Sequence, residues 1–182
     1  MVPTIQATKK RDVVLIMDLQ IKNHFSNLTD EEREKQGFVS LLTNKDVLTK
    51  LIETKLVFIA KNQFSKCVGY IFAIPRHYAD ELIFLKPLVL IADKHIPSQT
   101  KDYYVLGQIC VAQDFQGNGI ALRLYKRLER ELAGRKCKNI ITEVAISNQR
   151  SLIFHRDKVG FNELVTNSTN GQEFKVLIKT IS

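Results

Sequence analysis

Cysteine is scarce in this sequence, and its pattern excludes two kinds of site. The chain has 182 residues and three cysteines, Cys67, Cys110 and Cys137. An odd number at wide spacing matches neither a disulfide framework nor a zinc site. We therefore expect buried thiols and no bound metal, because free cysteine packs as a small hydrophobic side chain.

Long apolar runs are missing as well. No stretch reaches the roughly 18 consecutive apolar residues that a membrane-spanning helix needs. Residues 1–6 also lack the charged and then apolar regions of a signal peptide. The expectation is a cytoplasmic protein with no membrane partner.

Two familiar phosphate-binding motifs are absent too. Nothing in the sequence matches the Walker loop, Gly-x-x-x-x-Gly-Lys-Ser/Thr. The dinucleotide fingerprint requires a third glycine where Leu122 stands and an acidic residue about twenty positions later, and neither condition is met. Nucleoside triphosphates and nicotinamide cofactors are therefore disfavoured.

The composition that is present, 45% hydrophobic and 25% charged residues, is typical of a soluble globular protein. The length suits one domain and no linker or repeat interrupts it, so residues 1–182 are predicted to form a single domain. The formal net charge of +8 favours anionic partners, and basic residues gather between Gly119 and Lys138. Aromatic and basic residues do not interleave as stacked bases require, so no specific nucleic acid is expected.

The first part of the chain predicts short helices. Residues 12–25 fit either a strand or a helix, because periodicity alone does not separate the two. Thr29 begins a capping box for a short helix that stops at Gly37, and Thr43 or Asn44 can cap a second helix.

A hairpin follows, with apolar strands over 56–60 and 67–74. Residues 76–100 are predicted to be a helical or loop insertion, in which Pro87 would kink or split a helix.

The second half has a regular alternation of strands and helices. Ser147 can cap the second of these helices, and a strand-helix-strand unit usually gives two parallel strands. The predicted elements are a strand over 103–111, a helix to about Ala133, a strand over 139–145, a helix containing 152–154, a strand from Gly160 and a last strand over 173–178.

A glycine-containing turn joins the strand over 103–111 to the helix behind it. Gly117 and Gly119 let the backbone approach a ligand without an intervening side chain. Successive N–H groups there can converge on an anion, and the helix N-terminus adds partial positive charge. A plain strand-to-helix turn would use the same residues.

This turn resembles a known loop. Gln116-Gly117-Asn118-Gly119-Ile120-Ala121 is similar to the coenzyme A loop of the GNAT N-acetyltransferase superfamily, which reads Gln/Arg-x-x-Gly-x-Gly/Ala. The stretch from Glu143 to His155, with Gly160-Phe161 after it, is similar to the next strand and helix of that family. The resemblance extends over about residues 56–181.

The resemblance implies a mixed α/β (α+β) fold in one GNAT-like domain, with a central, mostly antiparallel twisted sheet flanked by helices. It implies acetyl-CoA as cosubstrate, an amine as partner, and dimers as a frequent state, so a homodimer stays open. Two departures stand out. His155 replaces the usual tyrosine, and one extra residue lies between Phe154 and Gly160.

The resemblance also implies roles for single residues. Backbone N–H groups of residues 116–121 would hold the diphosphate, and the strand at Ile109, Cys110 and Val111 would pair with pantetheine and offer an oxyanion donor. Asn148 either caps its helix or bonds the pantetheine, and Phe154 lies at the cofactor. The expected cofactor-binding residues are therefore Ile109, Cys110, Val111, Gln116, Gly117, Asn118, Gly119, Ile120, Ala121, Asn148 and Phe154.

Two side chains are candidates for proton transfer. Glu143 could accept the proton of the amine, and a protonated His155 could give one to the departing thiolate. A paired strand glutamate and a helix histidine bonded to backbone are the alternatives. Gln108 is no base, although its amide could polarise a water.

Three functions stay open at this point. The first is an N-acetyltransferase that uses acetyl-CoA and the amine of a small molecule or protein. The second is a GNAT-like module that binds acyl-CoA without turnover. The third is a basic nucleic-acid-binding domain, for which no known motif occurs.

Overall fold

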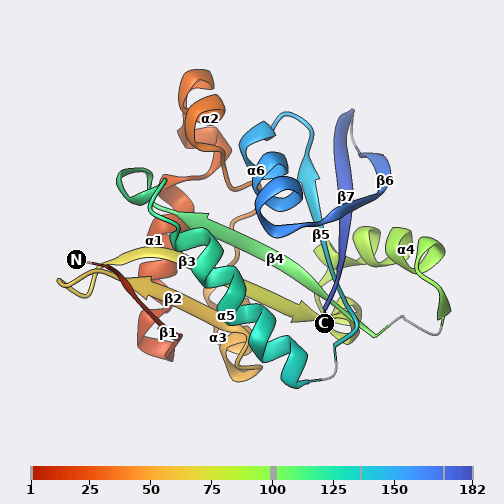
Figure 1. Cartoon of the computed structure of the whole chain (residues 1–182), viewed down its shortest axis with the longest axis horizontal. Coiled ribbons are helices and arrows are strands. Elements are labelled where there is room, and N and C mark those ends of the chain that lie inside the picture. Colours follow the sequence, from red (N-terminus) through yellow and green to blue (C-terminus); the bar gives the residue numbers. More distant parts are fainter. Residues whose placement is uncertain (1, 99–101, 136, 170, 182) are drawn as a thin grey trace. The chain divides into compact units, whose positions relative to one another are not determined.

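The computed structural model describes residues 2–98, 102–135, 137–169 and 171–181 (Figure 1). The chain divides into two compact units, one of Met1–Ala73 with Gly107–Glu131 and the other of Ile74–Leu106 with Leu132–Ser182. Strand β4 (Tyr103–Val111) and helix α5 (Ile120–Gly134) each contribute residues to both units.

The first unit contains a sheet with the strand order β1-β2-β3-β4. Strands β1 and β2 are antiparallel, as are β2 and β3, which form the predicted hairpin. The elements of this unit other than β4 and α5 are β1 (Thr4–Ala7), α1 (Val13–Lys22), α2 (Asp30–Gln36), α3 (Lys45–Glu53), β2 (Val57–Lys61) and most of β3 (Cys67–Pro75).

Neighbouring residues of β3 show that this sheet is covered on both faces. A Cβ added to Gly69 would lie 3.2 Å from Leu124 Cδ1 of α5, whereas the hydroxyl of the next residue, Tyr70, is bonded to Gln108, which in turn contacts Gln20 of α1. Side chains alternate between the faces of a strand. Helix α5 therefore packs on one face, as Figure 1 shows, and α1 contacts the other.

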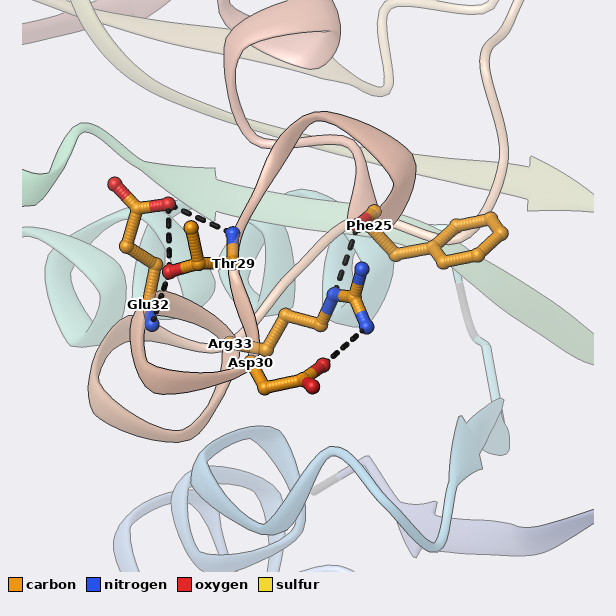
Figure 2. A network of polar contacts seen from close by, with 5 residues as sticks. All are labelled: Phe25, Thr29, Asp30, Glu32 and Arg33. Carbon is orange, nitrogen blue, oxygen red and sulfur yellow. Dashed lines mark hydrogen bonds and ion pairs between the residues drawn. The ribbon is translucent and has the colours of Figure 1, made fainter.

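The predicted capping box at the start of α2 is confirmed (Figure 2). Thr29 Oγ1 accepts a hydrogen bond from Glu32 N at 3.2 Å, and Glu32 Oε2 accepts one from Thr29 N at 2.8 Å. Figure 2 also shows Arg33 between Asp30 Oδ1, at 2.7 Å, and the carbonyl of Phe25, at 2.8 Å. Two of the acidic residues of this helix are thus used in its own first turn.

The other expectations for this unit are settled by local contacts. Residues 13–22 of the ambiguous stretch form the helix α1. Asn44 caps α3, since its side chain accepts from Val47 N at 2.9 Å. The alternative cap, Thr43, donates its own N–H to Gln20 instead.

The second unit has the strand order β4-β5-β7-β6. β4 and β5 are parallel, which confirms the prediction for the strand-helix-strand unit, and the β5–β7 and β6–β7 pairs are antiparallel. The elements other than β4 are α4 (Lys86–His95), β5 (Asn139–Ala145), α6 (Gln149–Ile153), a π-helix (Phe154–Val159), β6 (Asn162–Thr169) and β7 (Gln172–Thr180).

The predicted insertion over 76–100 is helical in its described part, and residues 99–100 lie outside the described residues. Two short 3-10 turns lead into α4. The stretch is divided beside Pro87, as predicted, because the 3-10 turn over Ile83–Leu85 ends there and Pro87 lies in the first turn of α4. A proline is tolerated there, since the N–H it lacks would have no intrahelical partner.

The helix after β5 begins and continues differently from the prediction. Asn148 caps α6, with its side chain accepting from Ser151 N at 3.3 Å, so the prediction of Ser147 as cap is wrong. The helix then widens into a π-helix and ends at Gly160, whose φ of 84° is left-handed. A π-turn holds one residue more than an α-turn, which accounts for the extra residue before Gly160.

The mixed α/β class is confirmed, with a mostly antiparallel sheet flanked by helices. Within the described ranges no helix combines the length and apolarity needed to cross a membrane. The single-domain assignment stays a prediction.

Candidate functional site

The glycine loop of the first unit has the backbone that an anion site needs. Gly117 and Gly119 have φ values of 78° and 70°, which residues with side chains rarely adopt. A Cβ at either position would meet no atom within 4 Å, so the space above the loop is open. The backbone conformation, rather than crowding, is what requires glycine here.

Helix α5 starts directly behind this loop. Its backbone bonding begins with Arg123 N donating to Gly119 O at 3.0 Å. The N–H groups of Ile120 and Ala121 precede that bond, and helix geometry leaves such groups without intrahelical acceptors. Together with the helix dipole they form a donor set suited to a diphosphate.

The N–H groups of Gln116, which the motif predicts to face the diphosphate, are bonded within the protein instead. Its backbone N–H donates to Gln113 O at 3.1 Å, inside the turn. Its side-chain Nε2 donates to Val111 O and to Gln36 O, both at 3.1 Å. Gln116 therefore ties the loop to the ends of β4 and α2, and the donors toward a ligand begin at Gly117.

Asn118 is also engaged locally. Its Nδ2 lies 3.3 Å from both Phe115 O and Gln116 O. These two long hydrogen bonds direct the Asn118 side chain toward the preceding residues of the loop. Its backbone N–H, rather than its side chain, is the group that a ligand could use.

The predicted cofactor strand, Ile109–Val111, has a defined neighbour on one side. Ala112 N donates to Val68 O of β3 at 2.9 Å in the first unit. In the second unit the described pairs of β4 with β5 end at Val105 and Ile141, and Leu106 O accepts from the side chain of Thr142 at 3.1 Å. Regular β4–β5 pairing is therefore described only for the first part of β4.

The three cysteines are all buried, as predicted. Burial raises the pKa of Cys67 and of Cys110 to about 12, and that of Cys137 to about 11. Thiols with these pKa values are protonated at neutral pH and are poor nucleophiles. A cysteine acyl-enzyme is therefore disfavoured.

Basic side chains of α5 are largely used within the first unit. Arg123 donates to Pro3 O at 3.1 Å. Arg127 stacks over the Phe58 ring at 4.4 Å and contacts Glu131 at 3.3 Å. Lys126 is exposed, and Lys136 of the same basic stretch lies outside the described residues.

Glu143, the predicted base, lies on β5 in the second unit, opposite Val176 of β7. The residue is half-buried. Burial raises the pKa of its carboxyl above the usual value, and a hydrogen bond from Asn167 acts in the opposite direction. A raised pKa strengthens a carboxylate as a base, which suits the predicted role.

His155, the predicted acid, is buried, with 3% of its surface exposed. Its Nδ1 lies 2.8 Å from Ser151 O, so Nδ1 carries the proton. The ring meets Phe154 and Phe161 edge to face, at 5.3 and 5.4 Å between centroids.

Burial lowers the pKa of His155 to about 4. The ring is then neutral at pH 7, and Nε2, which has no partner among the described residues, is an acceptor. Burial and the bond at Nδ1 both disfavour a proton on Nε2, so this geometry does not favour His155 as the proton donor, and that role stays a prediction.

The two other predicted cofactor residues also lie in the second unit. Asn148 is 5% exposed and is used as the cap of α6, which favours the first of its two predicted roles. Phe154 begins the π-helix and is half-buried.

A polar network in the first unit was not predicted. Gln108 Oε1 accepts from Tyr70 Oη at 2.6 Å and from Gln20 Nε2 at 2.8 Å. Gln20 and Tyr70 are 1% and 0% exposed. The signal available in the sequence was weak: a single glutamine within the apolar stretch of α1.

Comparison with known proteins assigns the family. The model of the acetyltransferase (GNAT) family matches residues 22–161. The chain belongs to the acetyltransferase (GNAT) family. The match includes the glycine loop, β5 and the π-helix, and it confirms the resemblance seen in the sequence.

Solved structures share the GNAT fold at low identity. The ribosomal-protein-S18-alanine N-acetyltransferase from Escherichia coli is 16% identical with a TM-score of 0.65, and the match covers 99% of this chain and 94% of that one. A chain of the NatC complex bound to Gag peptide and CoA is 15% identical, with a TM-score of 0.69 and full coverage of both chains (100%). The structure of yncA from Salmonella typhimurium with its cofactor acetyl-CoA is 13% identical, with a TM-score of 0.64 and coverage of 99% and 94%. No curated protein matches the chain in sequence.

Proposed function

We propose that this GNAT-family protein is an N-acetyltransferase that transfers an acetyl group from acetyl-CoA to a primary amine of a small molecule or protein. The observation that carries the proposal is the glycine loop, in which Gly117 and Gly119 have positive φ directly before the N-terminus of α5. Relatives of the same fold have been solved with acetyl-CoA or CoA.

Each part of acetyl-CoA can be matched to a chemically suitable group of the protein. The N–H groups of Gly117 to Ala121 are proposed to bind the diphosphate. The amide-rich pantetheine would pair with β4 at Ile109–Val111, as an added strand pairs with a sheet edge. An N–H of that strand would stabilise the thioester oxygen as it gains charge.

The chemistry is direct attack of the amine nitrogen on the thioester carbonyl. The C–N bond forms, the C–S bond breaks, and the amine loses one proton while coenzyme A leaves as the thiolate. Holding both reactants together can lower the barrier by about 7–11 kcal/mol. Phe154 is proposed to border the cofactor, and Asn148 to cap α6.

Coenzyme A binding to a loop variant tests this proposal. Gly119→Asp places a side chain and a negative charge where phosphate would bind, on a backbone with positive φ, and should abolish binding in calorimetry. Gly171→Asp is the matched control, because Gly171 has a φ of 77° with no atom within 4 Å of its Cβ position and lies outside the loop. Unchanged affinity in Gly119→Asp would refute the loop assignment.

Glu143 is proposed as the base that accepts the amine proton, directly or through a water. Free alkylamines have a pKa near 10.4, so they need a base near pH 7 and much less help near pH 9.5. Glu143→Gln should therefore lower turnover strongly near pH 7, and the difference from the wild-type protein should shrink near pH 9.5. A small loss that is equal at both pH values would remove Glu143 from the mechanism.

A non-catalytic acyl-CoA-binding module is the second candidate, and the state of His155 favours it. The position that the family resemblance gives to the proton donor holds a buried ring whose pKa is about 4. Release of free coenzyme A, followed with a thiol reagent across a panel of amines, separates the two. Binding of acetyl-CoA with no release of free coenzyme A in the presence of any amine would support the non-catalytic module.

A further inference from the structure

Three glutamine side chains hold one irregular segment of the first unit. Residues 36–43 run from the last residue of α2 to the residue before Asn44, the cap of α3, and we call them the 36–43 segment. Its carbonyl at Gln36 accepts from Gln116, its carbonyl at Leu41 accepts from Gln108, and its N–H at Thr43 donates to Gln20 at 3.2 Å. The segment is therefore tied at its start, middle and end.

The amide of Gln108 has only one orientation that satisfies its neighbours. Its oxygen faces two donors, Tyr70 Oη at 2.6 Å and Gln20 Nε2 at 2.8 Å. Its nitrogen faces the carbonyl oxygen of Leu41, a group that can only accept. A flipped amide would set like groups against each other, so the network fixes the side chain.

Several partners in these contacts are buried, whereas the bond from Gln108 to Leu41 O is exposed. Gln20 and Tyr70 are 1% and 0% exposed, and Thr43 and Gln36 are 5% and 8% exposed. Losing one partner would leave a buried polar group unsatisfied, which costs more than the net value of the bond itself. The position of the segment thus depends on the glutamines together with two backbone bonds of Val39, to Asn23 O at 2.8 Å and from Phe25 N at 3.0 Å.

Two of these glutamines also belong to the proposed cofactor-binding part of the first unit. Gln116 opens the glycine loop, and its Nε2 reaches Val111 O and Gln36 O together. Gln108 directly precedes Ile109–Val111 on β4. A ligand that fixes the loop and the strand would therefore also fix the 36–43 segment.

Two exposed apolar side chains of the segment suggest that it contacts the acceptor substrate. Leu41 and Leu42 are 39% and 46% exposed, although both are large and apolar. The carbonyl of Leu41 accepts a hydrogen bond from Gln108. Gln108 directly precedes Ile109–Val111, the part of β4 that is proposed to pair with the pantetheine next to the thioester. An acceptor that reaches the thioester along the first unit would meet this segment.

We infer that Gln108 and Gln116 are positioning residues for acyl transfer, which hold the 36–43 segment as the acceptor-side wall and link its order to occupation of the glycine loop. This inference rests on the proposed function for the identity of the ligands. Neither residue exchanges a proton with the substrates. Their effect passes through the segment.

Hydrogen exchange of the full chain, read by mass spectrometry, tests the inference with coenzyme A as the probe. Gln108→Met keeps the length of the side chain and removes its hydrogen bonds. Amides of the 36–43 segment should then exchange roughly tenfold faster, because the bond to Leu41 is lost and the buried donors of Gln20 and Tyr70 lose this acceptor, while those of β2 keep their rate. Coenzyme A should slow exchange of the segment in the wild-type protein and not in Gln116→Ala.

The control is Gln113→Ala, an exposed glutamine of the same turn, which should retain the protection by coenzyme A. If Gln116→Ala fails to fold, Tyr70→Phe removes one bond to Gln108 and should speed exchange of the same segment by a smaller factor. Equal exchange of the segment in Gln108→Met and wild-type protein would overturn the inference. So would protection by coenzyme A that persists in Gln116→Ala.

A kinetic measurement adds a readout that general loss of stability would not produce. With an amine that the wild-type protein acetylates, Gln108→Met should raise the KM for the amine about tenfold and change the KM for acetyl-CoA less than about threefold. If the wild-type protein binds no coenzyme A, the proposed function and the link to the loop both fall. The exchange rates of Gln108→Met then still decide whether the glutamines hold the segment.

Discussion

Gly69 is a residue whose missing side chain lets α5 lie close to β3. A Cβ there would come within 3.1 Å of Cys110 O, 3.2 Å of Leu124 Cδ1 and 3.3 Å of Val111 Cγ2. The nearest of these atoms belongs to the backbone of β4 and cannot move aside easily. The strand that leads to the glycine loop is thus positioned partly by the absence of a methyl group.

Gly69→Ala should therefore destabilise the protein by about 1–3 kcal/mol, the usual cost of overpacking. Chemical unfolding measures the effect. Gly134→Ala, in the last turn of α5 with no atom within 4 Å of the added Cβ, should be neutral or raise stability by up to about 1 kcal/mol. Equal values for the two variants would contradict the close packing.

His155 predicts how stability depends on pH. Burial lowers its pKa from 6.5 to about 4, so the unfolded chain binds a proton in this range and the folded chain does not. The contribution is complete above pH 6.5 and is lost as the pH falls toward 4. The loss amounts to about 3 kcal/mol, from the size of the shift.

His155→Phe removes this titration and keeps an aromatic ring between Phe154 and Phe161. Its free energy of unfolding should fall less than that of the wild-type protein between pH 6.5 and 4, as measured by urea unfolding. Parallel curves for wild-type protein and His155→Phe would show that His155 does not carry the effect.

At the scale of single elements, the π-helix predicts an unusual tolerance to deletion. A π-turn contains one residue more than an α-turn, so removing an exposed residue can convert it to a regular helix without rotating its flanks. Deletion of Arg156, which is exposed, should leave Asn148 as cap and Gly160 as terminator. Thermal unfolding should show a shift of only a few degrees, about that of a 1 kcal/mol change.

Deletion of Arg150 is the matched comparison, because it removes an exposed residue from the regular turn of α6. The residues beyond it would rotate by about 100° and Leu152 would leave the core. The unfolding temperature should fall much further than for the Arg156 deletion. The opposite order would show that the π-turn is needed for stability itself.

Elements with strong local signals could be predicted from the sequence, and those decided by distant contacts could not. Thr29 and Gly37 mark the ends of α2 through neighbours within a few residues, and both were recognised. Residues 13–22 stayed ambiguous, because their helical state depends on the sheet that they cover. The break beside Pro87 could also be predicted, because proline is tolerated in the first turn of a helix and not in its interior.

The candidate site shows the same limit at the scale of the whole molecule. The glycine loop could be found, since positive φ leaves a direct mark on residue choice at Gly117 and Gly119. The role of Gln116 could not, because its side-chain partner Gln36 lies 80 residues away along the chain. The neutral state of His155 depends on Phe161 and on burial, neither of which appears in a motif.

Both compact units are made of two separate stretches of chain, since β4 and α5 pass through each of them. During synthesis the first unit therefore remains incomplete until Glu131 has left the ribosome, although its first 73 residues emerge much earlier. The first 73 residues therefore lack β4 and α5 while the next 33 residues, Ile74 to Leu106, are synthesised. A nascent chain of this kind exposes apolar strands for longer than one that folds segment by segment, and chaperones act on such intermediates.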